Sequence, residues 1–213
     1  GVVGIFGAEN AASLSYFALT SLQHRGQESA GIAVCDSKVT LHKDLGLVGE
    51  VFHPGVFEKL KGSIAVGHVR YATAGGRTIE NAQPFLNTFK NGSIALAHNG
   101  QLVNHAQLRE ILEDEGSTFS SSSDSEVILK LIVRKFIEKG GKLGSNCHPE
   151  LVSGSDSQML KQVQHDTYDK DEIFISAVNQ AVKEIKGSFA LCIMTENMLI
   201  GVRDPNGIRP LCL

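Results

Sequence analysis

Four polar segments carry the residue types that could do chemistry in this 213-residue sequence: HRGQESAGI (24–32), GHVRYATAG (67–75), AHNGQLVN (97–104) and SSSDSE (121–126). Each lies beside an apolar stretch, which predicts that its polar side chains sit where a strand ends or a helix begins. Together they offer a cation for a carboxylate, an anion for an amine and donors for a developing negative charge. This set fits an α-amino acid whose side-chain carbonyl is attacked, although a nucleophile is missing.

The two charged positions are Arg70 and Asp124. A guanidinium at a strand end can hold a carboxylate with two hydrogen bonds, but a structural salt bridge is the simpler interpretation of an isolated Arg. Ser123 and Glu126 have the spacing of a helix capping box. Capping accounts for these two residues and leaves Asp124 at the positive end of a helix, where it can bind an amine.

The neutral donors are Asn99 and Gly100. Asn-Gly is a strong turn signal, and a plain hairpin is the simpler interpretation. Alternatively, the Asn side-chain NH₂ and the Gly backbone N–H converge on one point as an oxyanion hole. A donor of this kind contributes about 10²–10³ in rate.

The segment around His24, Arg25 and Gly26 has the features of a helix C-terminus. His24 and Arg25 would favour the negative end of the helix dipole, and Gly26 would be a left-handed cap. This interpretation leaves the three residues that follow unexplained.

The elements that must position these residues are short strands followed or separated by helices. Strands are predicted at Val2–Phe6, Gly31–Cys35, Val39–Lys43, Ser63–Val69, Ser93–His98, Ser188–Met194 and Met198–Val202. Helices are predicted at Ala11–Gln23, from Asn104, from Ser123 to Gly140, and at Asp171–Lys186. The first helix would have Leu14, Phe17, Ala18 and Leu22 on one face, and in the second Gln107 would be the capping partner of Asn104. Strands come first, helices lie between two groups of strands, and the last two strands form a hairpin. This order predicts an α+β fold of two mainly antiparallel sheets with helices outside both.

Composition narrows the class of protein. The chain is 42% hydrophobic with a net charge of −3, which gives no reason to expect nucleic acid or a membrane surface as partner. No apolar run approaches the roughly 20 residues of a membrane span. The four cysteines are scattered, so neither a zinc site nor a redox pair is expected, and a cytoplasmic location with free thiols is favoured.

One polar stretch, residues 141–169, lacks periodicity and predicts a surface loop. Its run CHPELVSGSDSQMLKQVQHDT also resembles translated repeat elements inserted in frame in bacterial genes. On that interpretation it is an inserted surface segment, placed between two helices where it disturbs the core least.

The four segments and the closing DPNGIRPL resemble the N-terminal glutaminase domain of the glutamine phosphoribosylpyrophosphate amidotransferases, which are class II glutamine amidotransferases. The likeness covers nearly the whole chain outside 141–169. It implies a four-layer αββα sandwich of the N-terminal-nucleophile hydrolase type for residues 1–213. It further implies a C-terminal phosphoribosyltransferase domain, outside this chain, that uses Mg²⁺, and a homo-oligomer. No metal or cofactor is expected in the glutaminase domain itself, and an iron–sulfur cluster elsewhere is left open.

The resemblance also implies roles for residues. Arg70 would hold the α-carboxylate of glutamine, Asp124 its α-amine, and Asn99 with Gly100 the oxyanion. Arg25 and Thr73 would shape the pocket around the nucleophile.

The family's nucleophile is a Cys that would stand directly before Gly1, and the sequence as given lacks it. The mechanism needs a thiol and a free α-amine on one residue, since an amine that titrates at about 8 can accept the thiol proton. None of the four cysteines present meets this need. The expected function is glutamine hydrolysis, with the ammonia passed to phosphoribosyl pyrophosphate to give 5-phosphoribosylamine in the first step of purine synthesis. Two alternatives stay open: an amidotransferase for another acceptor, such as a sugar phosphate, and a glutamine-binding or structural module that lacks a nucleophile.

Overall fold

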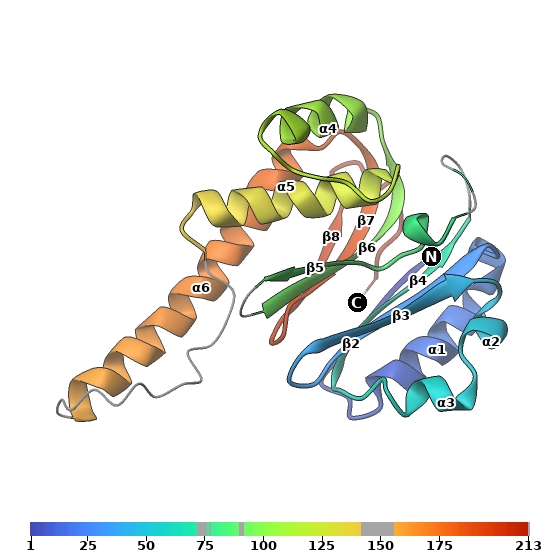
Figure 1. The fold of residues 1–213 in the computed structure, drawn as a ribbon, viewed down its shortest axis with the longest axis horizontal. Coiled ribbons are helices and arrows are strands. Elements are labelled where there is room, and N and C mark those ends of the chain that lie inside the picture. Colours follow the sequence, from blue (N-terminus) through green and yellow to red (C-terminus); the bar gives the residue numbers. More distant parts are fainter. Residues whose placement is uncertain (72–75, 77, 90–91, 142–155, 213) are drawn as a thin grey trace.

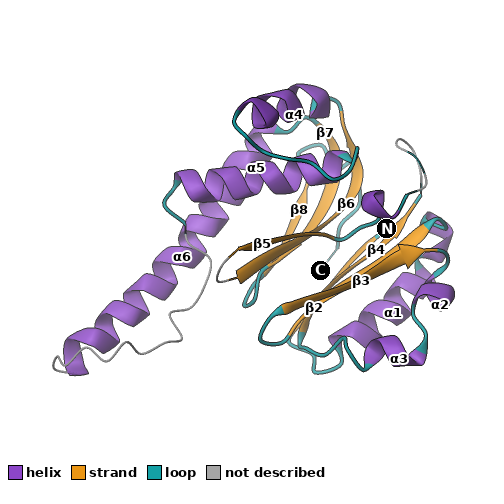
Figure 2. Cartoon of the chain, in the orientation of Figure 1, coloured by secondary structure: helices purple, strands orange, loops and turns teal. Residues whose placement is uncertain are grey.

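The computed structural model describes residues 1–71, 76, 78–89, 92–141 and 156–212, with only the backbone described at 156–169. Two four-stranded sheets form the centre of the molecule (Figures 1 and 2). The first has the order β1-β4-β2-β3 and the second the order β5-β6-β7-β8, and every pairing is antiparallel. The strands are β1 (Val2–Phe6), β2 (Ser29–Cys35), β3 (Val39–Leu45), β4 (Ile64–Arg70), β5 (Phe85–Phe89), β6 (Gly92–Leu102), β7 (Gly187–Met194) and β8 (Leu199–Arg203).

Helices cover the outer face of each sheet (Figure 1). The first sheet packs against α1 (Ala11–Ser21), α2 (Val48–Val51) and α3 (Pro54–Phe57), with the 3₁₀ turn η1 (Gln23–Arg25) after α1. The second packs against α4 (His105–Asp114), α5 (Asp124–Glu138) and α6 (Asp156–Glu184), and the 3₁₀ turn η2 (Ile79–Asn81) precedes β5. The predicted αββα sandwich is therefore confirmed.

The central strands are apolar on both faces because each face meets a different layer. In β2, Ile32 and Val34 face the α1 side, whereas Ala33 and Cys35 face the second sheet. In β6 and β7 the same alternation places one set of side chains against α5 and the other set between the sheets. This two-sided burial explains the nearly continuous apolar runs in the sequence.

Several expected elements differ from the structure. Leu14 and Phe17 of α1 are exposed, and the helix instead buries Ala11, Ala12, Ser15 and Leu19. Leu19 packs closely on β4, where the absence of a side chain at Gly67 makes room for it: a Cβ on Gly67 would lie 2.9 Å from Leu19 Cδ1. The sequence analysis also missed β5, α2 and α3.

Helix α6 begins at Asp156, which is earlier than the expected Asp171. Its first half extends away from both sheets (Figure 1). The loop predicted for 156–169 is therefore wrong, because these residues are helical, and residues 142–155 lie outside the described part of the chain. From Phe174 onward the helix packs into the second core.

Of the two predicted capping pairs, the one at α5 is half-formed and the one at α4 is not formed. Ser123 caps α5 by accepting a hydrogen bond from the Ser125 amide at 3.2 Å. Glu126, however, binds the backbone and hydroxyl of Ser120 and Ser121 in the preceding loop. Asn104 makes no cap hydrogen bond to α4 and joins the end of α6 instead.

Candidate functional site

A pocket of about 470 Å³ lies where β4 and β6 end and α5 begins. It is lined by Arg70, Asp124, Asn99, Gly100 and Arg25, which are five of the six residues singled out in the sequence. Gly1 also lines this pocket, and its amino group donates a hydrogen bond to the Val69 carbonyl at 2.8 Å. The sixth residue, Thr73, lies outside the described residues.

Arg70 is buried at the last position of β4 and faces the pocket. Its Nη1 lies 3.3 Å from Oε2 of Glu28, and the Glu28 amide donates to the Arg70 carbonyl at 3.1 Å. The salt bridge considered as the simpler interpretation is therefore present, and the guanidinium still belongs to the pocket wall. A guanidinium held in this way is ordered before a ligand arrives.

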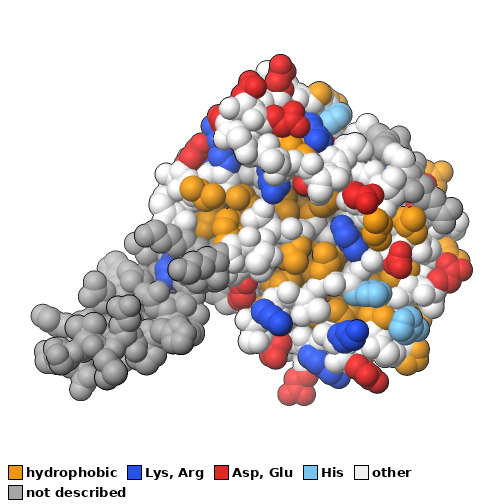
Figure 3. Space-filling model, in the orientation of Figure 1, with side chains coloured by type: hydrophobic (Ala, Val, Ile, Leu, Met, Phe, Trp, Pro, Cys, Tyr) orange, Lys and Arg blue, Asp and Glu red, His pale blue; other side chains and the backbone are white. Residues whose placement is uncertain are grey.

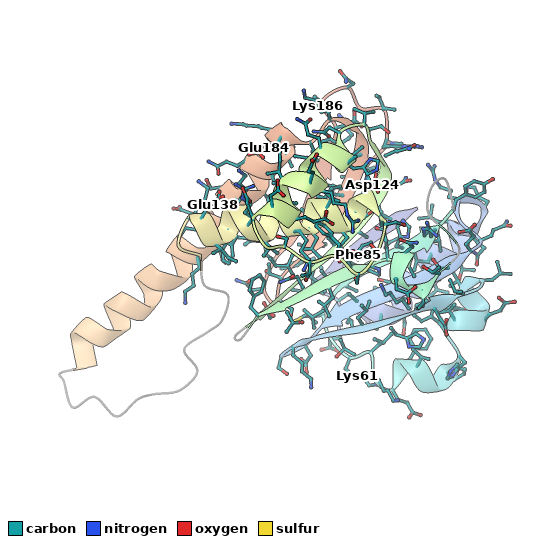
Figure 4. The ribbon with its side chains drawn as sticks, turned by 45° about the horizontal axis from the view of Figure 1, so that its top comes forward. Lys61, Phe85, Asp124, Glu138, Glu184 and Lys186 are labelled. Atoms are coloured by element: carbon teal, nitrogen blue, oxygen red, sulfur yellow. The ribbon has the colours of Figure 1, made fainter. Side chains whose placement is uncertain are left out.

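Asp124 is the first residue of α5, at the end of the helix that lies toward the first sheet (Figure 4). Its Oδ2 accepts a hydrogen bond from the Leu102 amide at 2.9 Å, and its Oδ1 lies 3.6 Å from Nδ1 of His98. Burial raises the pKa of this carboxyl, but the contacts to His98 and Leu102 outweigh it and leave the pKa below the usual value. Asp124 is therefore an anion at neutral pH, directed at the pocket.

Asn99 and Gly100 lie inside β6, so the hairpin interpretation of the Asn-Gly pair is wrong. Gly100 has φ of +155°, and a Cβ there would collide with the Ser188 carbonyl oxygen of β7. Only glycine fits this position. Among the described residues no hydrogen-bond partner is found for the Asn99 side chain, and Asn99 lines the pocket.

Arg25 ends the 3₁₀ turn η1. Gly26 has φ of −176°, which is extended backbone, so the predicted left-handed cap is wrong. The glycine is needed for space instead, because a Cβ would lie 2.5 Å from the Val69 carbonyl carbon. This close approach brings Arg25 to the same pocket wall as Gly1.

Arg209 also lines the pocket, and the sequence analysis did not single it out. The Asp204 carboxylate organises its loop by accepting hydrogen bonds from the amides of Asn206, Ile208 and Arg209. The D-P-x-G turn within DPNGIRPL was the available signal, since an Asp at that position binds the backbone of its own turn.

The cysteines that the structure describes lie away from the pocket. Cys35 and Cys192 are free and buried, and burial raises the pKa of each thiol to about 11. Cys212 is free but exposed, and Cys147 lies outside the described residues. Cys35 and Cys192 are thus poor sources of a thiolate at neutral pH.

The described residues contain no group of three or more His, Cys, Asp or Glu side chains that could hold a metal ion. Nor does the described part of the chain include a helix long and apolar enough to cross a membrane. Acidic and basic side chains are interspersed over the face shown in Figure 3.

Known proteins resemble this chain in sequence and in fold. Residues 53–147 match the family model of the glutamine amidotransferase domain. Over these residues the chain is similar to the glutamine amidotransferase domain. Over its whole length the chain is 46% identical to the amidophosphoribosyltransferase of Bacillus subtilis and 41% identical to that of Archaeoglobus fulgidus. It spans only 38% and 40% of the length of these two relatives.

Solved structures give the same result. The glutamine phosphoribosylpyrophosphate amidotransferase of B. subtilis, complexed with ADP and GMP, matches 98% of this chain with a TM-score of 0.75 and 42% identity. This chain covers 38% of that one. The resemblance inferred from the sequence motifs is confirmed.

Proposed function

We propose that this domain hydrolyses glutamine to glutamate and ammonia through a thioester on a cysteine placed directly before Gly1. The single observation that carries the proposal is the pocket shared by Arg70, Asp124, Asn99, Gly100 and Gly1. These residues come from β4, α5, β6 and the chain start, and they match the two charged ends and the reacting amide of one amino acid.

Binding in this proposal uses the two charges. Arg70 holds the α-carboxylate, and its pairing with Glu28 fixes the direction of the guanidinium. Asp124 receives the α-ammonium group, because its depressed pKa keeps it ionised. Arg25, which lines the pocket, shapes the wall near the nucleophile. The same role for Thr73 is proposed from the sequence motif alone.

Chemistry in this proposal begins at the residue before Gly1. Its α-amine takes the thiol proton, and the thiolate attacks the side-chain amide carbon of glutamine. The Asn99 side-chain NH₂ and the Gly100 backbone N–H stabilise the oxyanion of the tetrahedral intermediate. The protonated amine gives its proton to the leaving ammonia, and water then hydrolyses the thioester to release glutamate and restore the thiol.

The whole protein is proposed to be an amidophosphoribosyltransferase, which is the name carried by the relatives that match this chain. A C-terminal phosphoribosyltransferase domain that uses Mg²⁺ would join this ammonia to phosphoribosyl pyrophosphate, giving 5-phosphoribosylamine in purine synthesis. A homo-oligomer and a cytoplasmic location stay predictions from the sequence.

The test is the stoichiometry of the full-length protein. With glutamine, phosphoribosyl pyrophosphate and Mg²⁺, glutamate and pyrophosphate should be released in equal amounts. A parallel reaction with fructose 6-phosphate as acceptor should consume no sugar phosphate. Amination of the sugar phosphate would identify another acceptor, and glutamine binding without glutamate release would identify a binding module.

A further inference from the structure

Three consecutive residues, Asn81, Ala82 and Gln83, form a segment that contacts several parts of the pocket wall. We call it the 81–83 segment. All three residues are buried, and they connect η2 to β5. The Ala82 carbonyl accepts a hydrogen bond from Nζ of Lys43 on β3, so the segment is tied to the first sheet.

Gln83 continues the second sheet with its side chain. The register of β5 and β6 pairs Phe85 with Leu96, so its continuation places Gln83 opposite His98. The side-chain amide makes both hydrogen bonds that a strand would make there. Its Nε2 donates to the His98 carbonyl at 3.2 Å, and its Oε1 accepts from the His98 amide at 2.7 Å.

The main chain of Gln83 explains why a side chain is needed. Its carbonyl oxygen lies so close to Gly31 of β2 that a Cβ on Gly31 would collide with it. The backbone has therefore turned toward the first sheet. Gln83 thus fixes β6 at the residue directly before Asn99 and Gly100.

Asn81 makes the equivalent contact to the loop before α5. Its Oδ1 accepts hydrogen bonds from the amide and hydroxyl of Ser122 at 3.2 and 3.3 Å. Ser122 lines the pocket two residues before Asp124. One short segment therefore holds the oxyanion donors through Gln83 and the amine-binding carboxylate through Asn81.

We propose that Gln83 and Asn81 are positioning residues with separate effects, Gln83 on the oxyanion hole and Asn81 on the site for the substrate ammonium group. The inference rests on the proposed glutaminase function. It predicts different kinetic consequences, because oxyanion contacts strengthen in the transition state whereas the ammonium contact is already formed in the bound substrate.

The experiment measures glutamate release by the full-length protein and glutamate binding by calorimetry. Gln83→Met keeps the length of the side chain and removes both hydrogen bonds. Its kcat should fall about tenfold to a hundredfold, with KM for glutamine and the affinity for glutamate within about twofold of wild type. Gln83→Glu has no donor for the His98 carbonyl and should lose a similar part of kcat.

Asn81→Leu should raise KM about tenfold and weaken glutamate binding equally, with kcat nearly unchanged. Asn81→Asp keeps the acceptor for Ser122 and should recover most of this loss. Asn104→Leu is the matched control. Asn104 also binds backbone in both directions, to the Glu184 carbonyl and the Lys186 amide, but it does not line the pocket. Its loss should lower stability and leave both kinetic constants unchanged.

The outcomes separate this inference from the function on which it rests. Wild-type protein that releases no glutamate overturns the proposed function, and calorimetry with Asn81→Leu then still tests the segment. If the wild type is active and the Gln83 variants have a normal kcat, the proposed role of Gln83 is wrong. It is also wrong if these variants are impaired only through a higher KM. If neither Gln83 variant folds while Asn104→Leu does, the segment is purely structural and the inference is wrong.

Discussion

Glu28 holds Arg70 by both its main chain and its side chain. The Glu28 amide donates to the Arg70 carbonyl at 3.1 Å, and Oε2 of Glu28 lies 3.3 Å from Nη1 of Arg70. Glu28 belongs to the HRGQESAGI segment and Arg70 to GHVRYATAG, so the pair joins two of the four segments from which the site was predicted. The pair also gives a role to Glu28, which the interpretation of this segment as a helix C-terminus left unexplained.

Arg70→Ala should raise KM for glutamine about tenfold to a hundredfold, because a charge-assisted contact to the α-carboxylate is lost. Arg70→Lys should recover only part of this, since an ammonium group cannot make the same two parallel hydrogen bonds. Steady-state kinetics of glutamate release check both values. Glu28→Gln, which keeps a hydrogen-bond acceptor but removes the charge, should have a smaller effect on KM than Arg70→Ala. Equal KM values for Arg70→Ala and wild type would exclude Arg70 from glutamine binding.

Gly100→Ala should lower both stability and activity. The substituted residue would keep a φ that disfavours side chains and would also collide with the Ser188 carbonyl. Gly116→Ala is the matched control, because Gly116 has φ of +90° but open space around it. The control should lose about 1–2 kcal/mol of unfolding free energy, and Gly100→Ala should lose about 1–3 kcal/mol more. If chemical denaturation gives similar losses of unfolding free energy for Gly100→Ala and Gly116→Ala, the β7 backbone moves aside at Ser188 at little cost.

Asp124 should make stability depend on pH in the acid range. Its folded pKa lies below the ordinary value of 3.8, so its ionised form stabilises the fold above that pH. The contribution should disappear as pH falls through the lower folded pKa. Thermal unfolding of wild type and Asp124→Asn between about pH 6 and pH 2 measures this difference. The stability gap between the two proteins should narrow toward the acid end, and a gap independent of pH would contradict the assignment.

Replacing residues 141–169 by a short linker should leave the fold intact, because loop-closure free energy changes slowly with length. The part of α6 that packs in the second core begins beyond this stretch, at residues such as Phe174. Phe174→Ala is the contrasting variant and should cost about 3–5 kcal/mol. Circular dichroism and denaturation compare the two. A deletion as destabilising as Phe174→Ala would show that the stretch packs into the core.

The sequence predicted seven of the described strands. The central ones, β2, β4, β6 and β7, are nearly continuous apolar runs, a pattern that can be recognised without knowing how the strands pair. Strand β5 was not predicted, because Asn87 and Thr88 interrupt its apolar run and it lies at a sheet edge. The buried face of α1 was wrong for a different reason. Leu19 of this helix packs on Gly67 of β4, and Ala11, Ala12 and Ser15 are buried together with Leu19 while Phe17 is exposed.

The charged residues of the site could be predicted from the sequence, but the residues that hold them in place could not. Arg70 and Asp124 are visible in the sequence because charged residues stand beside apolar runs. The contacts of Glu28, Gln83 and Asn81 join segments that are distant in the chain, and no local pattern reports such pairs. Asn99-Gly100 was ambiguous because a turn and a strand that approaches its neighbour closely both select glycine.

The most direct measurement compares glutamate release by proteins that differ only in the residue before Gly1. Cys with a free α-amine at this position should be active. Ser at the same position, Cys behind an uncleaved Met, and the chain beginning at Gly1 should each release little or no glutamate, because they lack the thiol, the free amine or both. Glutamate release from the chain beginning at Gly1 at the rate of the Cys-bearing protein would contradict the account, since the reaction would then need no nucleophile at the mouth of this pocket.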